Sequence, residues 1–432
     1  MTLSHHFPTF HRMLHARLDP GRWPPGTRIT ADGDMLVGGV ALTRVAARHG
    51  TPAAVLDVAE VRRRCAAHRA ALPWADLGWS AAALAAPGVL RLVAAQGLSV
   101  TVGSVAELAA ARAAGVPAAA TLARRPLPGF AGAVVLRDPR EAGEHPDRAA
   151  APRPVLLAVA LRGHGPGVAP GDAVEAVRRL LAGPGVRLAG LHAVPGPPGS
   201  RVSAYEAAVR VLLAVASALR EAHGVAVERL HLSGDGVVPA SDPHGLAQRL
   251  RTAMDYECRV LRLPAPRLTL ETGRALLAPA AVTLLRVVTA TGAAVTLEGP
   301  LTGSVAGPLT GPVGDTFAQP RSAIPGAPAA PFAEPSAAAH AGPFDPYAEP
   351  SAEPAPGPDP AVRLVGRSQG AKLRTVGVGG PGEGPRRLPL PEDVAPGDLL
   401  AVAHRVGGPA LACGPGHALV AVEDGAARLL TE

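Results

Sequence analysis

Residues 187–232, RLAGLHAVPGPPGSRVSAYEAAVRVLLAVASALREAHGVAVERLHL, contain one strand–helix–strand unit. The runs 187–192 and 229–232 are short and largely apolar, which is typical of buried strands. Between them, residues 203–223 carry apolar side chains at spacings of three to four positions with arginines opposite, a pattern that predicts an amphipathic helix. Strands joined through a helix pair in parallel, so the unit indicates an α/β fold.

The same alternation extends over residues 51–286. The other candidate strands are residues 53–57, 99–102, 133–137, 154–161 and 267–271. The other candidate helices are residues 58–72, 104–114, 172–181 and 243–263. Ser104 and Asp172 are expected N-caps, and Ser104 with Glu107 fits a capping box. Seven or eight such units predict an α/β protein with a (β/α)₈, TIM-like barrel over residues 51–286.

After residue 286 the sequence pattern changes to short β-prone runs separated by Gly and Pro. This pattern predicts a C-terminal β domain over residues 287–432. We expect the N-terminal segment, residues 1–50, to contribute to this β domain by packing on it. Residues 319–360 are rich in Ala, Pro, Gly and Glu, and repeat the sequence AEPSA at 333–337 and 348–352. A segment of this composition buries too little apolar surface to offset its ordering entropy, so a disordered insertion is predicted.

The composition is that of a globular chain whose cores consist of Ala, Val and Leu, because 47% of the 432 residues are hydrophobic and only 3% are aromatic. The net charge is +7, but the arginines are scattered without an aromatic-basic stripe, so no nucleic-acid partner is expected. No apolar run of membrane-spanning length and no signal-peptide core occur, so neither a membrane span nor export is expected. The cysteines, Cys65, Cys258 and Cys413, match no metal or disulfide spacing, which fits a reducing cytoplasm.

Short motifs follow one another in a fixed order along the chain. They are HGTPAAVLD at 49–57, SVAEL at 104–108, GLH at 190–192, ETGRA at 271–275 and PGDLLAV at 396–402. In this order and spacing they resemble the diaminopimelate decarboxylases of actinobacteria, in the alanine-racemase-like class (fold type III) of pyridoxal-phosphate enzymes. The resemblance implies a barrel that holds pyridoxal phosphate at the carboxyl ends of its strands, a β domain that closes the site, and a dimer whose two subunits both contribute to each site.

The resemblance also locates the lysine that bonds the cofactor as a Schiff base in this family. That position is Ala82, in the run WSAAAL at 79–84, and a methyl group cannot form such a bond. Lys372 is the one lysine among the 42 lysines and arginines of the chain. An arginine cannot take the role, because its guanidinium stays protonated and is a poor nucleophile.

Cofactor contacts are implied at seven positions. They are Glu271, Gly273, Arg274, Gly234, Gly236, Ser200 and His192. Gly234 and Gly236 belong to a turn whose backbone N–H groups bind phosphate in the family, although Asp235 interrupts its run of glycines. Ser200 remains after a Pro-Gly insertion in the motif that precedes it.

Three of these residues have two interpretations each. His192 is next to the ring-stacking position of the family, which Val194 occupies here, so His192 is either a ligand contact or a histidine at a strand end. Glu271 bonds the pyridine nitrogen of the cofactor in the active family, and Arg274 belongs to the same element. Alternatively, Glu271 and Arg274 form an ion pair that stabilises the fold.

The family residues of the β domain are replaced. The resemblance puts the catalytic cysteine at Gln369, the substrate-binding arginine near Ala306, and the late tyrosine near residues 407–408. No catalytic residue is therefore identified, and no metal site is expected.

Two functions remain open. The favoured one is a homologue that has lost decarboxylation and acts as a binding or regulatory paralogue. Its partner is a small molecule in the remnant pocket, a second copy in a homodimer, or an active relative in a mixed dimer. The alternative is an active pyridoxal-phosphate decarboxylase that converts meso-diaminopimelate to L-lysine in lysine biosynthesis, with Lys372 as the rearranged Schiff-base residue. A barrel with unrelated chemistry has no supporting residues.

Overall fold

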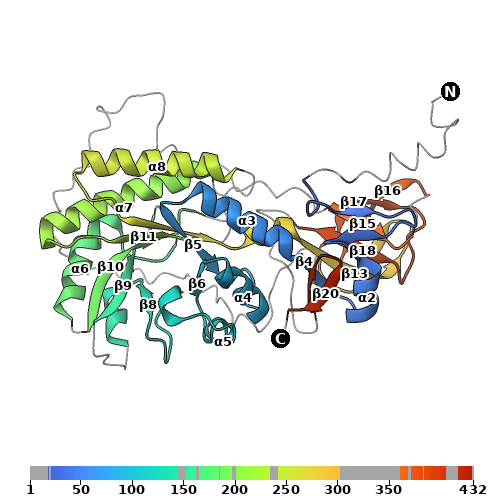
Figure 1. Ribbon diagram of the computed structural model, residues 1–432, viewed down its shortest axis with the longest axis horizontal. Coiled ribbons are helices and arrows are strands. Elements are labelled where there is room, and N and C mark those ends of the chain that lie inside the picture. Colours follow the sequence, from blue (N-terminus) through green and yellow to red (C-terminus); the bar gives the residue numbers. More distant parts are fainter. Residues whose placement is uncertain are drawn as a thin grey trace.

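Eight parallel strands form a closed barrel, which lies beside a mixed β sheet along the long axis of the molecule (Figure 1). The computed structural model describes residues 18, 21–144, 152–161, 165–183, 185–196, 201–233, 242–301, 361–367, 371–382, 384–404 and 417–430. The barrel strands are β5 (Ala75–Ser80), β6 (Ser99–Val102), β7 (Thr121–Ala123), β8 (Ala133–Leu136), β9 (Arg153–Ala158), β10 (Val186–Ala193), β11 (Arg229–Leu232) and β12 (Arg267–Thr272). This arrangement confirms the predicted barrel class.

Helices cover the outside of the barrel. They are α3 (Val58–Ala71), α4 (Pro87–Ala95), α5 (Val105–Ala113), α6 (Ala173–Ala182), α7 (Val202–His223) and α8 (Pro243–Val260). The Ser104 hydroxyl accepts the Glu107 N–H at 3.1 Å and so caps α5 as predicted, whereas Asp172 precedes α6 without a side-chain capping bond. Of the described helices, α7 has the length and apolar composition of a membrane span, but half of its apolar window is buried in the protein, where Leu212 and Leu213 join the barrel core.

The second sheet joins strands from the two ends of the chain. Its members are β4 (Ala53–Asp57), β13 (Ala281–Ala290), β14 (Ala294–Leu297), β15 (Ala361–Val365), β16 (Leu373–Gly379), β17 (Arg386–Pro391), β18 (Leu399–Ala403), β19 (Ala418–Glu423) and β20 (Ala426–Leu429). A small sheet of β1 (Arg28–Ile29), β2 (Met35–Val37) and β3 (Val40–Ala41), followed by α2 (Leu42–His49), packs against it. Met35 and Leu42, both fully buried, share one core with Val282 of β13.

The assignment of residues 53–57 to the barrel was wrong. Strand β4 pairs antiparallel with β13 and parallel with β19, and all five of its residues are buried. Leu56 packs in the barrel core while Val55 packs in the β-sheet core, so β4 lies between the two. The barrel instead begins at β5, a strand that the sequence pattern did not predict, as it did not predict β7. A fully buried apolar run has no polar face, and its pattern therefore does not indicate which sheet it joins.

Candidate ligand-binding site at the carboxyl end of the barrel

The carboxyl ends of the barrel strands bring together side chains from distant parts of the sequence. Ser80 ends β5, Arg124 directly follows β7, His192 is the penultimate residue of β10, Ser233 directly follows β11, and Glu271 is the penultimate residue of β12. In parallel barrels this end carries the binding and catalytic residues. This end of the barrel is therefore the candidate site.

The strand register determines which side chains enter the barrel interior. Neighbours along a strand alternate between two faces, and residues paired across parallel strands share a face. Leu191, Leu230 and Leu232 pack into the core beneath the outer helices. His192 and His231, which alternate with these leucines and pair with each other, consequently face the interior.

The interior has an apolar half and a polar half. The apolar half, contributed by β7, β8 and β9, consists of Leu122, Ala133, Val135, Leu156 and Ala158. The polar half, contributed by β10, β11, β12, β5 and β6, contains the buried residues His192, His231, Thr269, Glu271, Ser80 and Thr101. Because buried polar groups need hydrogen-bond partners, this polar half is costly unless it is satisfied by the protein or by a ligand.

His192 and His231 form a stacked pair in the polar half. Their ring centroids lie 5.3 Å apart with an interplanar angle of 18°, and Nε2 of His192 is 3.0 Å from the hydroxyl oxygen of Ser233. Gly190 permits this close packing of β10 on β11, because a Cβ at that position would lie 2.3 Å from the carbonyl oxygen of Arg229. Burial lowers the pKa of His192 to about 3 and holds the pKa of His231 well below its usual value, so both rings are neutral at pH 7.

Arg124 is a positively charged side chain near enough to this pair to affect its ionisation. Its backbone N–H extends the pairing of β6 and β7 by donating to the Val102 carbonyl at 2.8 Å, and its guanidinium donates to the Ser80 hydroxyl at 3.3 Å. The carboxylate of Glu107 lies 3.8 Å away, and 29% of the Arg124 side chain is exposed. The charge of Arg124 contributes to the lowered pKa of both histidines, after burial for His192 and after burial and His192 for His231.

Arg124, His231 and Ser80 are not among the site residues predicted from the sequence. For His231 a signal exists, because it is a polar residue between two leucines in a short apolar strand, RLHL at 229–232. Arg124 has no comparable signal, since it is one of many arginines and directly precedes a second one, Arg125. The position of Arg124 at the carboxyl end of the barrel follows only from the pairing of β7 with the neighbouring barrel strands.

The Glu271 element lies at the carboxyl end of the barrel. Glu271 is 1% exposed on β12, opposite Gly78 of β5. Gly273 caps the short helix α9 (Arg274–Leu277), and Arg274 is its first residue. Glu271 and Arg274 each have a hydrogen-bond, ion-pair or electrostatic partner. A buried carboxylate at this position fits the nitrogen of a pyridine ring, so this part of the site is compatible with non-covalent binding of pyridoxal phosphate.

Ala82 lies in the turn that follows β5 at the carboxyl end of the barrel. Its side chain is exposed between the buried residues Ala81 and Ala83, and the Ala83 N–H donates to the Ser80 carbonyl at 3.0 Å. A longer side chain at this position therefore has room. The alanine does not fit covalent attachment of the cofactor, because it offers no amine.

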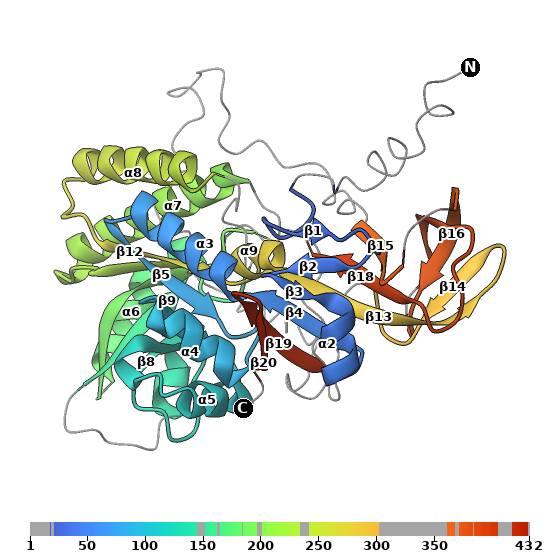
Figure 2. The ribbon, with the colours of Figure 1, turned by 45° about the vertical axis from the view of Figure 1, so that its right-hand side comes forward.

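The remaining predicted residues lie elsewhere or outside the described part of the chain. Ser200, Gly234, Gly236 and Gln369 fall outside the described residues, as does the 319–360 segment. Lys372 is exposed and directly precedes β16, a strand that lies away from the barrel in both views (Figures 1 and 2). Within the described ranges no group of three or more His, Cys, Asp or Glu side chains could hold a metal ion.

A closed parallel barrel with a polar carboxyl end and an adjoining mixed sheet is the architecture of the fold type III pyridoxal-phosphate enzymes. The chain is 37% identical over 324 residues to the diaminopimelate decarboxylase of Actinosynnema pretiosum subsp. auranticum, covering 66% of this chain and 72% of that protein. The chain belongs to the diaminopimelate decarboxylase family. A search of protein-family models found no match.

Solved structures show the same fold. The diaminopimelate decarboxylase of M. jannaschii superimposes with a TM-score of 0.71 at 16% identity, over 95% of each chain. SrLDC in complex with PLP and cadaverine superimposes with a TM-score of 0.61 at 18% identity, over 85% of this chain and 87% of that one. At these identities the structures support the architecture alone.

Proposed function

We propose that this chain is a member of the diaminopimelate decarboxylase family that has lost decarboxylation and acts by binding. The observation that carries the proposal is Ala82, an exposed methyl group in the turn after β5 where the resemblance puts the cofactor lysine. Without an amine at this position, the covalent step from which the chemistry of the family begins has no nucleophile. The replacement of the family cysteine by Gln369 supports the same proposal.

The cofactor implied by the family is pyridoxal phosphate, which when bound serves as an electron sink for carbanions. In this chain Glu271 and Arg274 would hold it without a covalent bond, Glu271 through the ring nitrogen. His192 is the further contact that we propose, since it faces the same interior. Gly234, Gly236 and Ser200 remain proposed phosphate contacts on the strength of the resemblance alone.

The partners that we propose follow from the family. A homodimer, or a mixed dimer with an active relative, would use a surface that the decarboxylase fold already provides. A regulatory paralogue of this kind would act in the cytoplasm beside the enzymes of lysine biosynthesis. Neither a nucleic-acid partner nor a membrane partner is part of the proposal.

The test is an absorption spectrum of the purified protein with pyridoxal phosphate, followed by borohydride reduction, peptide mapping and measurement of carbon dioxide released from meso-diaminopimelate. We expect no reducible lysine adduct and no carbon dioxide, because Lys372 precedes β16 rather than a barrel strand. The Lys372→Ala variant is the control and should behave as the wild type does. An adduct that maps to Lys372, disappears in Lys372→Ala and accompanies carbon dioxide release would instead establish the active decarboxylase.

A further inference from the structure

Arg124, His231 and Ser80 have no role in the resemblance to the decarboxylases. His231 stacks on His192, Arg124 donates to Ser80, and all four side chains belong to the carboxyl end of the barrel. We propose that Arg124, His192 and His231 form a binding site for the oxyanion group, carboxylate or phosphate, of a small molecule. This inference rests on the proposed binding function and names the class of ligand. Three features of the site support it.

The first feature is an unsatisfied hydrogen-bonding capacity on both histidines. His192 is 4% exposed and His231 is 3% exposed, and within the described residues neither Nδ1 atom has a hydrogen-bond partner. A buried polar atom without a partner destabilises the protein, and most such atoms in native structures are satisfied by the protein or by water. A ligand oxygen that accepts a hydrogen bond from such a ring nitrogen removes this cost.

The second feature is the charge of Arg124, which is only partly compensated. The carboxylate of Glu107 is 3.8 Å from the guanidinium and also accepts the Gly103 N–H at 2.7 Å. The planar guanidinium suits bidentate recognition of carboxylate or phosphate oxygens. Because 29% of the Arg124 side chain is exposed, a small anion can reach it from solvent.

The third feature is that the arrangement of the two imidazole rings and the guanidinium disfavours binding of a metal cation. A metal ion needs imidazole nitrogens that converge on one point, whereas the rings of His192 and His231 stack in nearly parallel planes. The positive charge of Arg124 adds repulsion. An anion does not need convergent imidazole nitrogens, and the charge of Arg124 attracts it.

Calorimetric titration with inorganic phosphate and, separately, with succinate at constant ionic strength tests the proposal and distinguishes the two sources of the oxyanion. We expect the wild type to bind at least one probe. The Arg124→Gln variant should bind it roughly ten-fold or more weakly, as expected for loss of a charge-assisted hydrogen bond. Arg125→Gln is the matched control, because it removes the same charge from the neighbouring, exposed residue and should change affinity by no more than about two-fold.

A second measurement on the wild type avoids any folding defect in the variants. The imidazole nitrogen resonances of His192 and His231, assigned with His192→Gln and His231→Gln, should shift when the binding probe is added. Absence of binding by both probes, equal losses in Arg124→Gln and Arg125→Gln, or unshifted imidazole resonances would each overturn the proposal. None of these results bears on adduct formation after borohydride reduction, so failure of this inference is distinguishable from failure of the proposed function.

Discussion

His192 and His231 lie directly opposite each other on the parallel strands β10 and β11, with their rings stacked inside the barrel. The barrel interior excludes water from both rings, and the guanidinium of Arg124 is close enough to affect their ionisation. Burial and the charge of Arg124 therefore act in the same direction, and both favour the neutral imidazole. This pair makes the stability of the barrel depend on pH.

Unfolding should become easier as the pH falls below about 6.5. The unfolded chain binds protons on both histidines from that pH downward, whereas the folded protein, in which the pKa of His192 is about 3, does not. The stability is therefore fully present above pH 6.5 and is lost toward pH 3, with a slope of up to about 1.4 kcal/mol per pH unit for each histidine. Urea unfolding at pH 7, 6 and 5 should show a shallower loss for His192→Gln than for wild type. Parallel curves for the two proteins would contradict the prediction.

The Ala82→Lys variant should form a borohydride-reducible adduct with pyridoxal phosphate that maps to position 82. Ala82 is exposed in its turn, so the longer side chain should change the free energy of unfolding by no more than about 0.5 kcal/mol. Ala182→Lys is the matched control, because Ala182 is an exposed alanine that ends α6 at the opposite, amino end of the barrel. Equal labelling of the two variants would show that position 82 does not adjoin a cofactor site.

The Glu271→Gln variant should lower stability more than it lowers affinity for pyridoxal phosphate. Glu271 is buried and has a partner, and a change that leaves a buried polar group unsatisfied typically costs about 1 to 3 kcal/mol. Glu228→Gln is the control, since Glu228 pairs with Arg187 at 2.9 Å on the surface, where such pairs are worth about 0 to 1 kcal/mol. Chemical denaturation and cofactor titration measure the two effects. Unchanged stability with lost affinity would show that Glu271 serves cofactor binding alone and does not stabilise the fold.

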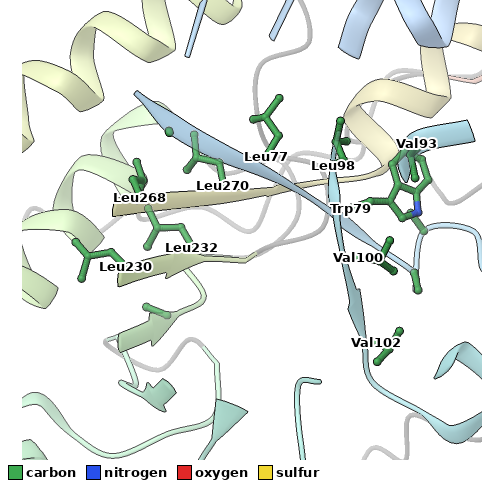
Figure 3. Packing of buried hydrophobic residues seen from close by; sticks show 14 of the residues in the cluster. Leu77, Trp79, Val93, Leu98, Val100, Val102, Leu230, Leu232, Leu268 and Leu270 are labelled. Atoms are coloured by element: carbon green, nitrogen blue, oxygen red, sulfur yellow. The ribbon is translucent and has the colours of Figure 1, made fainter. Parts of the chain in front are cut away.

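Replacement of Trp79 by phenylalanine should cost little. Trp79 packs beside Val93, Leu98 and Val100 beneath the helices (Figure 3), and its indole nitrogen is buried without a hydrogen-bond partner among the described residues. Trp79→Phe therefore loses apolar contact but also removes an unsatisfied donor, and we expect a loss of no more than about 1.5 kcal/mol. Trp79→Ala, which leaves a cavity, should cost about 3 to 5 kcal/mol. Similar thermal unfolding of Trp79→Phe and Trp79→Ala would contradict this prediction.

The barrel class, the limits of several helices and the family could all be predicted from the residues alone. Helix 58–72 was predicted within one residue of α3, and helix 203–223 within one residue of α7. Such helices are encoded locally, because the three-to-four spacing of apolar residues and the capping groups lie within one segment. The absence of a lysine at Ala82 was also evident from the sequence, since it concerns residue identity alone.

Which strands share a sheet, and which polar side chains meet, depends on contacts between segments that lie far apart in the chain. Residues 53–57 are predicted as a strand from their pattern. Their partners β13 and β19 lie far along the chain, and the pattern of a buried apolar run does not indicate which strands it pairs with. The grouping of Arg124 with His192 and His231 is likewise non-local. Closure of the barrel directs side chains of alternate positions on distant strands into one interior, and this geometry, rather than any motif, assembles the oxyanion site that we propose.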